Sequence, residues 1–137
     1  MSFSGKRYRR VRCENVDELI IASGSNENLI VMLKSNAPIF SFTRLDDTTF
    51  DFSLEMPDKT ITHKIKLGED HIMERRDGSK VNITYTLESE NVLKQVITPN
   101  EGKIAYFKRE FGDNGAVMTI RMEDTDIEAT VYYEQLQ

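Results

Sequence analysis

The sequence has 137 residues, a formal net charge of −5 and 39% hydrophobic residues. A chain of this length can bury roughly two thirds of its unfolded surface, and the composition is typical of a folded domain rather than a disordered one. The negative net charge argues against a protein that binds nucleic acid over its whole surface. No hydrophobic run approaches the length of about 18 residues that a membrane-spanning helix needs.

The N-terminal residues MSFSGKRYRR lack the hydrophobic core of a signal peptide. Cys13 is the only cysteine of the chain, so no intrachain disulfide can form, which agrees with a reducing compartment. No residue nearby in the sequence would activate its thiol, and we interpret Cys13 as structural. We therefore expect a cytoplasmic protein, with the nucleus as a second compartment.

The first predicted strand is strongly basic. Lys6, Arg7, Arg9, Arg10 and Arg12 lie within seven residues. A cluster of this kind is typical of a surface that binds nucleic acid, a nuclear partner or an anionic membrane. It is also typical of a solvated edge strand, whose charges discourage pairing with another sheet. The sequence leaves both interpretations open, and we favour the edge strand.

Two short helices are predicted back to back, over 15–23 and 26–35. Asn15 and Glu18 have the spacing of a capping box at the start of the first helix, and Gly24 can end it. The second helix must stop before the proline that follows it closely in the sequence. This interval separates the basic strand from the rest of the chain.

The chain after these helices is predicted to form strands. Short segments rich in β-branched and aromatic residues alternate with turn signals, such as RDGS at 76–79 and GDNG at 112–115, about every ten residues. With the basic strand, this pattern indicates ten strands joined mostly by hairpins, and so an all-β antiparallel sandwich or barrel. Because the sequence contains no repeat, low-complexity tract or linker, we expect a single domain over residues 1–137.

Several strands alternate clearly enough to assign their two faces. One face is almost entirely hydrophobic, and we predict that it points to the interior. The residues on these faces are Phe50, Phe52, Leu54 and Met56; Ile61, His63, Ile65 and Leu67; Val81, Ile83, Tyr85 and Leu87; Ala116, Met118, Ile120 and Met122; and Ile127, Ala129, Val131 and Tyr133. No Asp or Glu occurs among them.

Arg109 interrupts this pattern in the segment YFKREF at 106–111. Alternation places it on the same face as Phe107 and Phe111. Arginine stays charged in proteins, and an unpaired buried ion costs several kcal/mol. We predict that a ligand supplies the missing anion. Two alternatives stay open: Arg109 reaches solvent through a strand end or a different register, or it pairs with an acid from a loop.

A barrel of ten strands leaves space inside for a ligand. Hydrophobic walls with one cation would suit a long hydrophobic molecule that carries one acid group. A fatty acid has this chemistry.

Longer stretches of the sequence agree with this interpretation. They are FSGKRYRRVRCENVDELI near the N-terminus, KIKLGED, RRDGSKVNITYT, YFKREFGDNG and, near the C-terminus, VYYEQ. In their order and spacing they resemble the intracellular lipid-binding proteins, the fatty-acid-binding and cellular retinoid-binding group, and most closely the insect-type fatty-acid-binding proteins. The resemblance implies a ten-stranded antiparallel up-and-down β-barrel with a helix-turn-helix lid between the first two strands.

The resemblance also implies a ligand site, in which two internal arginines and a tyrosine bind the carboxylate. Arg109 matches the first arginine and Tyr133 the tyrosine, whereas Val131 stands where the second arginine is usual. We therefore expect Arg109 to bind the carboxylate and the Tyr133 hydroxyl to donate a hydrogen bond to it. The cavity would be lined by Phe40, Phe52, Leu54, His63, Ile65, Ile83, Tyr85, Phe107, Met118, Ile120 and Val131.

The lid would form the portal of the cavity or simply pack on the barrel mouth. Its hydrophobic positions are Val16, Leu19, Ile20, Leu29, Ile30, Met32 and Leu33, and Val16 replaces an aromatic residue that is usual in the family.

The predicted function is non-catalytic binding and intracellular transport of a long-chain fatty acid, with no cofactor and no metal. One alternative is a carrier of retinoic acid or another hydrophobic carboxylate. Another is an interaction protein that uses the basic strand at 6–12. An enzyme is not expected, because no nucleophile, metal-ligand or phosphate-loop motif is found. We expect a monomer that contacts anionic membranes transiently and binds no nucleic acid.

Overall fold

The computed structural model describes residues 3–22, 39–74, 78, 80–99 and 103–136. This part of the chain is all-β apart from one short helix between the first two strands, α1 (Val16–Ala22). The strands are β1 (Arg7–Glu14), β2 (Ile39–Arg44), β3 (Thr49–Glu55), β4 (Thr60–Lys66), β5 (Asp70–Glu74), β6 (Lys80–Ser89), β7 (Val92–Pro99), β8 (Ala105–Phe111), β9 (Gly115–Met122) and β10 (Glu128–Leu136).

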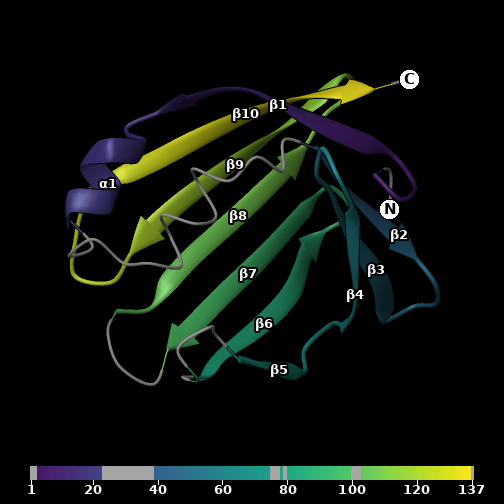
Figure 1. Cartoon of the computed structure of the whole chain (residues 1–137), viewed down its shortest axis with the longest axis horizontal. Coiled ribbons are helices and arrows are strands. Elements are labelled where there is room, and N and C mark those ends of the chain that lie inside the picture. The colour runs from purple at the N-terminus through teal and green to yellow at the C-terminus, as the bar shows by residue number, and fades with distance from the viewer. Residues whose placement is uncertain (1–2, 23–38, 75–77, 79, 100–102, 137) are drawn as a thin grey trace.

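The ten strands form one antiparallel sheet in the order β4-β3-β2-β1-β10-β9-β8-β7-β6-β5. Strands that follow one another in the chain pair with each other, except β4 and β5, and β1 pairs with both β2 and β10. Figure 1 shows the sheet curving round so that β4 and β5, its two edges, come to the same side. The predicted ten-stranded antiparallel up-and-down barrel is confirmed, as a barrel that is nearly closed.

Alternation of side chains between the two faces builds the interior. In β6, for example, Val81, Ile83 and Tyr85 are buried while Thr86 is exposed. Aromatic rings from distant parts of the chain meet inside: Phe3, which precedes β1, stacks on Phe111 of β8 with ring centroids 4.0 Å apart. Most of the hydrophobic faces predicted from period-two alternation therefore form the core, whereas Ile127, predicted to point inward, is 36% exposed.

The turn GDNG at 112–115 joins β8 and β9 tightly. The Gly112 N–H donates to the Gly115 carbonyl at 2.8 Å. A Cβ atom on Gly115 would overlap with the carbonyl oxygen of Tyr133 on β10, so only glycine lets the two strands approach this closely. The turn thus helps to place Tyr133.

Helix α1 packs at the end of the barrel formed by β9 and β10 (Figure 1). Val16 and Leu19 are buried, and the Asn15 side-chain amide donates to the Glu128 carbonyl of β10 at 3.3 Å. The first helix of the predicted pair is confirmed, whereas the second, over 26–35, lies outside the described residues. Neither α1 nor any other described segment is a helix long and hydrophobic enough to cross a membrane.

The edge-strand interpretation of the basic segment is wrong. β1 lies in the middle of the sheet, because it pairs with β10, the last strand of the chain, as well as with β2. Its arginines are partnered by acids on the outer face: Arg7 with Glu55, Arg9 with Glu134, and Arg12 with Glu14. The sheet edges are β4 and β5 instead.

Candidate ligand-binding site

Arg109 lies on β8 with only 5% of its surface exposed. Its guanidinium carbon is 5.8, 5.6 and 5.9 Å from the ring centroids of Phe40, Phe42 and Phe52. These rings come from β2 and β3, so they reach Arg109 from another part of the sheet. The inward orientation predicted from strand alternation is confirmed, and the ring faces stabilise the cation only weakly.

Arg109 is hydrogen-bonded to Gln95 on β7. Arg109 Nη1 donates to Gln95 Oε1 at 2.8 Å. Gln95 is 3% exposed, and among the described residues these two are the buried polar or charged ones. Our sequence reasoning missed Gln95, although its alternation with Leu93 and Ile97 in VLKQVI would have placed it on the inward face.

Two tyrosines complete the polar part of the interior. Tyr85 lies opposite Gln95 in the pairing of β6 with β7. Tyr133, on β10, sits edge-on to Phe40 with ring centroids 4.7 Å apart. Burial raises the pKa of both hydroxyls, and the positive charge of Arg109 opposes part of this rise. Both tyrosines therefore remain neutral hydrogen-bond donors near Arg109 at neutral pH.

Arg109 has no anionic partner within the described part of the chain. Its Nε atom is buried without a hydrogen-bond partner, and no Asp or Glu is among the buried residues there. Burial accordingly lowers the pKa of Arg109, and the two tyrosine hydroxyls counteract this effect. The interior thus holds a cation whose charge the surrounding described side chains do not neutralise.

The comparisons with known proteins point to one group. No protein-family model matches the chain. Fatty acid-binding protein 2 of Manduca sexta is 28% identical over 135 residues, which are 98% of this chain and 99% of that protein. Cellular retinoic acid-binding protein 1 of Gallus gallus is 29% identical over 115 residues, 81% of this chain and 83% of that protein. The solved structure of the fatty-acid-binding protein isolated from Manduca sexta has a TM-score of 0.78 at 26% identity and covers 96% of this chain and 98% of that one.

Along most of its length the chain is similar to fatty-acid-binding and cellular retinoic acid-binding proteins. The resemblance found in the sequence motifs is therefore confirmed at the level of the whole chain, including the likeness to an insect protein.

Most of the residues predicted to line the cavity lie on the inner face of the sheet. The buried ones are Phe40, Ile65, Ile83, Tyr85, Phe107, Met118, Ile120 and Val131, while Phe52 and Leu54 are half-buried. Val131 lies opposite Met118, which lies opposite Arg109, so the position of the usual second arginine faces the same interior. Their contact with a ligand stays a prediction.

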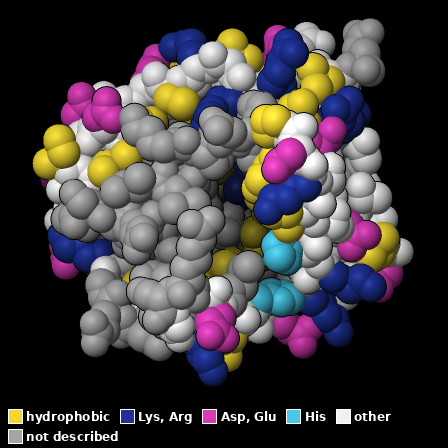
Figure 2. Space-filling view, viewed as in Figure 1, with side chains coloured by type: hydrophobic (Ala, Val, Ile, Leu, Met, Phe, Trp, Pro, Cys, Tyr) yellow, Lys and Arg dark blue, Asp and Glu magenta, His cyan; other side chains and the backbone are white. Residues whose placement is uncertain are grey.

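His63 departs from this pattern because it is exposed. It lies opposite Phe52 and shares the face of the buried Ile65, but β4 is an edge strand, so its side chains are covered from one side only. Figure 2 shows histidine side chains beside a hollow on this face of the molecule, with hydrophobic side chains visible in its depth. We therefore no longer place His63 in the enclosed part of the lining.

Of the predicted portal residues, only those on α1 lie within the described part of the chain. Val16 and Leu19 are buried and Ile20 is half-buried, so these three pack against the barrel. Ile21 is 75% exposed and was not among the predicted positions. The remaining predicted portal residues, Leu29, Ile30, Met32 and Leu33, lie outside the described residues.

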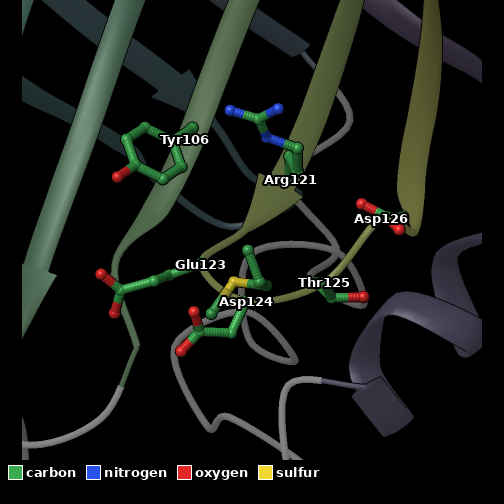
Figure 3. A pocket seen from close by; sticks show the side chains of 7 residues that line it. Tyr106, Arg121, Glu123, Asp124, Thr125 and Asp126 are labelled. Atoms are coloured by element: carbon green, nitrogen blue, oxygen red, sulfur yellow. The ribbon is translucent and has the colours of Figure 1, made fainter.

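A second depression, of about 290 Å³, lies at the turn between β9 and β10. Figure 3 shows that the carboxylates of Glu123, Asp124 and Asp126 point in different directions around it, with Arg121 beside the Tyr106 ring. In the described residues, no group of His, Cys, Asp or Glu is arranged to hold a metal ion. The depression therefore has no convergent set of ligands, unlike the surroundings of Arg109.

Proposed function

We propose that the protein binds and transports a long-chain fatty acid without catalysing a reaction. The barrel encloses the hydrophobic tail, and Arg109 with Tyr133 binds the carboxylate. One observation carries the proposal: a buried guanidinium whose Nε has no partner and whose hydrogen-bonded neighbour, Gln95, is neutral. The names of the relatives support it, because fatty acids and retinoic acid are all hydrophobic carboxylic acids.

The energetics favour such a ligand. A buried charge without a counter-ion costs several kcal/mol, and a carboxylate beside Arg109 would offset much of this cost. Each methylene group removed from water contributes about 0.8 kcal/mol before the costs of association are subtracted. A long tail and one charged head together can therefore give tight binding without any chemical step.

Retinoic acid is the second candidate, because a cellular retinoic acid-binding protein is 29% identical to this chain over 115 residues, against 28% over 135 residues for the fatty acid-binding protein. Both ligands would use Arg109 in the same way, so the shape of the interior decides between them. Competition between oleic acid and all-trans retinoic acid for the purified protein would rank the two.

An interaction function for the basic strand is not proposed, because three of its arginines are already paired with Glu55, Glu134 and Glu14. A single domain over residues 1–137 is part of our proposal, and the continuous ten-stranded sheet supports it. The monomeric state, the cytoplasmic location and transient membrane contact stay predictions.

The variant Arg109→Met tests the proposal by removing the charge while keeping a long side chain. We expect the dissociation constant for oleic acid to rise about 10-fold to 100-fold, since hydrogen bonds to a charged group contribute about 1.5–3 kcal/mol. Binding of methyl oleate, which has no negative charge, should change by no more than about threefold on the same reasoning.

Arg121→Met is the matched control, because Arg121 is exposed on the outer face of the neighbouring strand β9. It should bind both ligands like the wild type. An equal loss of acid and ester binding in Arg109→Met would contradict a carboxylate anchor. Mass spectrometry of lipid extracted from the purified protein should independently find a free acid rather than a neutral lipid.

A further inference from the structure

The orientation of the Gln95 amide follows from its two neighbours. A guanidinium can only donate hydrogen bonds, so the atom of Gln95 that faces Arg109 must be the carbonyl oxygen. The amide NH₂ group is then free to donate to the hydroxyl of Tyr85, which lies directly opposite Gln95 on β6. Tyr85, Gln95 and Arg109 are all buried and lie on three neighbouring strands, and Gln95 is hydrogen-bonded to Arg109.

We propose that Gln95, held by Tyr85, is a positioning residue that fixes the Nη1 side of Arg109 and thereby presents the Nε side to the carboxylate of the ligand. This inference rests on the proposed function, because it concerns how the same acid is bound. Gln95 itself need not touch the ligand.

The geometry of the guanidinium supports this assignment. The group is planar, and a carboxylate binds it best through two parallel N–H bonds along one edge. Nη1 already donates a hydrogen bond to Gln95 at 2.8 Å, so this corner of the guanidinium is occupied. Nε, on another edge, is buried and unpartnered in the described part of the chain. The edge that contains Nε is thus the one left for a bidentate anion.

The neutrality of Gln95 matters as much as its position. An amide oxygen satisfies one N–H of Arg109 and holds its side chain without cancelling its charge. A carboxylate at the same place would form an internal ion pair and compete with the ligand. A neutral hydrogen-bond acceptor at position 95 is therefore what allows a single buried arginine to serve an external acid.

The variant Gln95→Glu tests the inference, because it replaces the amide by a carboxylate of the same shape. We expect binding of oleic acid to weaken at least about 10-fold, while binding of methyl oleate is unchanged. Thr86→Glu is the matched control: it adds the same charge on the exposed face of β6, opposite Lys94. It should leave both affinities at their wild-type values.

A second measurement uses the wild-type protein and does not depend on a variant that folds. The ¹H–¹⁵N signal of the Arg109 Nε–H group, identified by its absence in Arg109→Met, should shift when oleic acid is added and stay in place with methyl oleate. In Gln95→Met, which removes the acceptor but keeps the cation, this signal should broaden or move even without ligand.

The results for the Arg109 and Gln95 variants test the role of Gln95 separately from the proposed function. If Arg109→Met binds oleic acid normally, the carboxylate anchor itself is wrong. If Arg109→Met loses acid binding but Gln95→Glu keeps it, or if oleic acid leaves the Nε–H signal of the wild type unchanged, only the role of Gln95 is overturned.

Discussion

Arg109 and Val131 together define the charge of the interior. Val131, at the position where a second arginine is usual, is buried on β10 and carries no charge. Arg109 is the only buried cation among the described residues. Its neighbours are aromatic rings and a neutral amide. The outer face shows the opposite arrangement: Arg12 stacks on the Tyr132 ring at 3.9 Å and also pairs with Glu14. The same residue type is thus neutralised outside and left available inside.

The buried tyrosines should make the protein sensitive to alkaline pH. Burial raises the pKa of Tyr85 above its ordinary value of 10.0, so above about pH 10 the unfolded chain releases a proton that the folded state retains. The stabilisation is complete below that pH and is lost as the pH rises through the folded pKa. In urea unfolding from about pH 9 to about pH 11.5, Tyr85→Phe should lose less stability than the wild type.

Tyr106→Phe provides the control, since Tyr106 is on the outer face and 36% exposed. Its loss of stability with pH should match that of the wild type. If Tyr85→Phe instead follows the wild-type curve, burial of this hydroxyl does not control the alkaline transition.

The short helix α1 depends on its contacts with the barrel. With seven residues, it is too short to be stable by itself in water. Leu19 is fully buried, and Asn15 ties the start of the helix to β10. The sequence predicted this helix from the capping-box spacing of Asn15 and Glu18 and from Gly24, but it could not show that β10 would be the partner.

Leu19→Ala should therefore destabilise the protein. Removing a fully buried leucine side chain costs about 2–5 kcal/mol in the free energy of unfolding, which urea denaturation followed by circular dichroism can measure. Ile21→Ala, two positions along the same helix, should change it by less than about 0.5 kcal/mol because Ile21 is largely exposed. Similar effects of the two changes would show that α1 does not pack as described.

Apart from Arg109, the charged side chains of the described residues lie outside the buried core. The net charge is −5, and the basic strand β1 lies in the middle of the sheet with acids beside its arginines. We correctly predicted the number of strands and their antiparallel order from the turn spacing. The position of β1 could not be predicted that way, because it depends on pairing with the far end of the chain.

Ligand binding should depend little on salt. Arg109 is buried, and ions in solution screen buried pairs much less than exposed ones. Between about 0.05 M and about 0.5 M NaCl, the dissociation constant for oleic acid should change by less than about twofold. Binding to an anionic matrix such as heparin should be weak at both salt concentrations. A steep loss of oleic acid binding with salt would favour an exposed site on β1 instead.

The sequence by itself placed Arg109 on the hydrophobic face of its strand, because the alternation of a strand has a period of two and is purely local. Only the tertiary structure decided what Arg109 meets there. Gln95 reaches it from β7 and the aromatic rings reach it from β2 and β3. These contacts depend on the register between strands and on the curvature of the sheet, which residues distant in the chain set together.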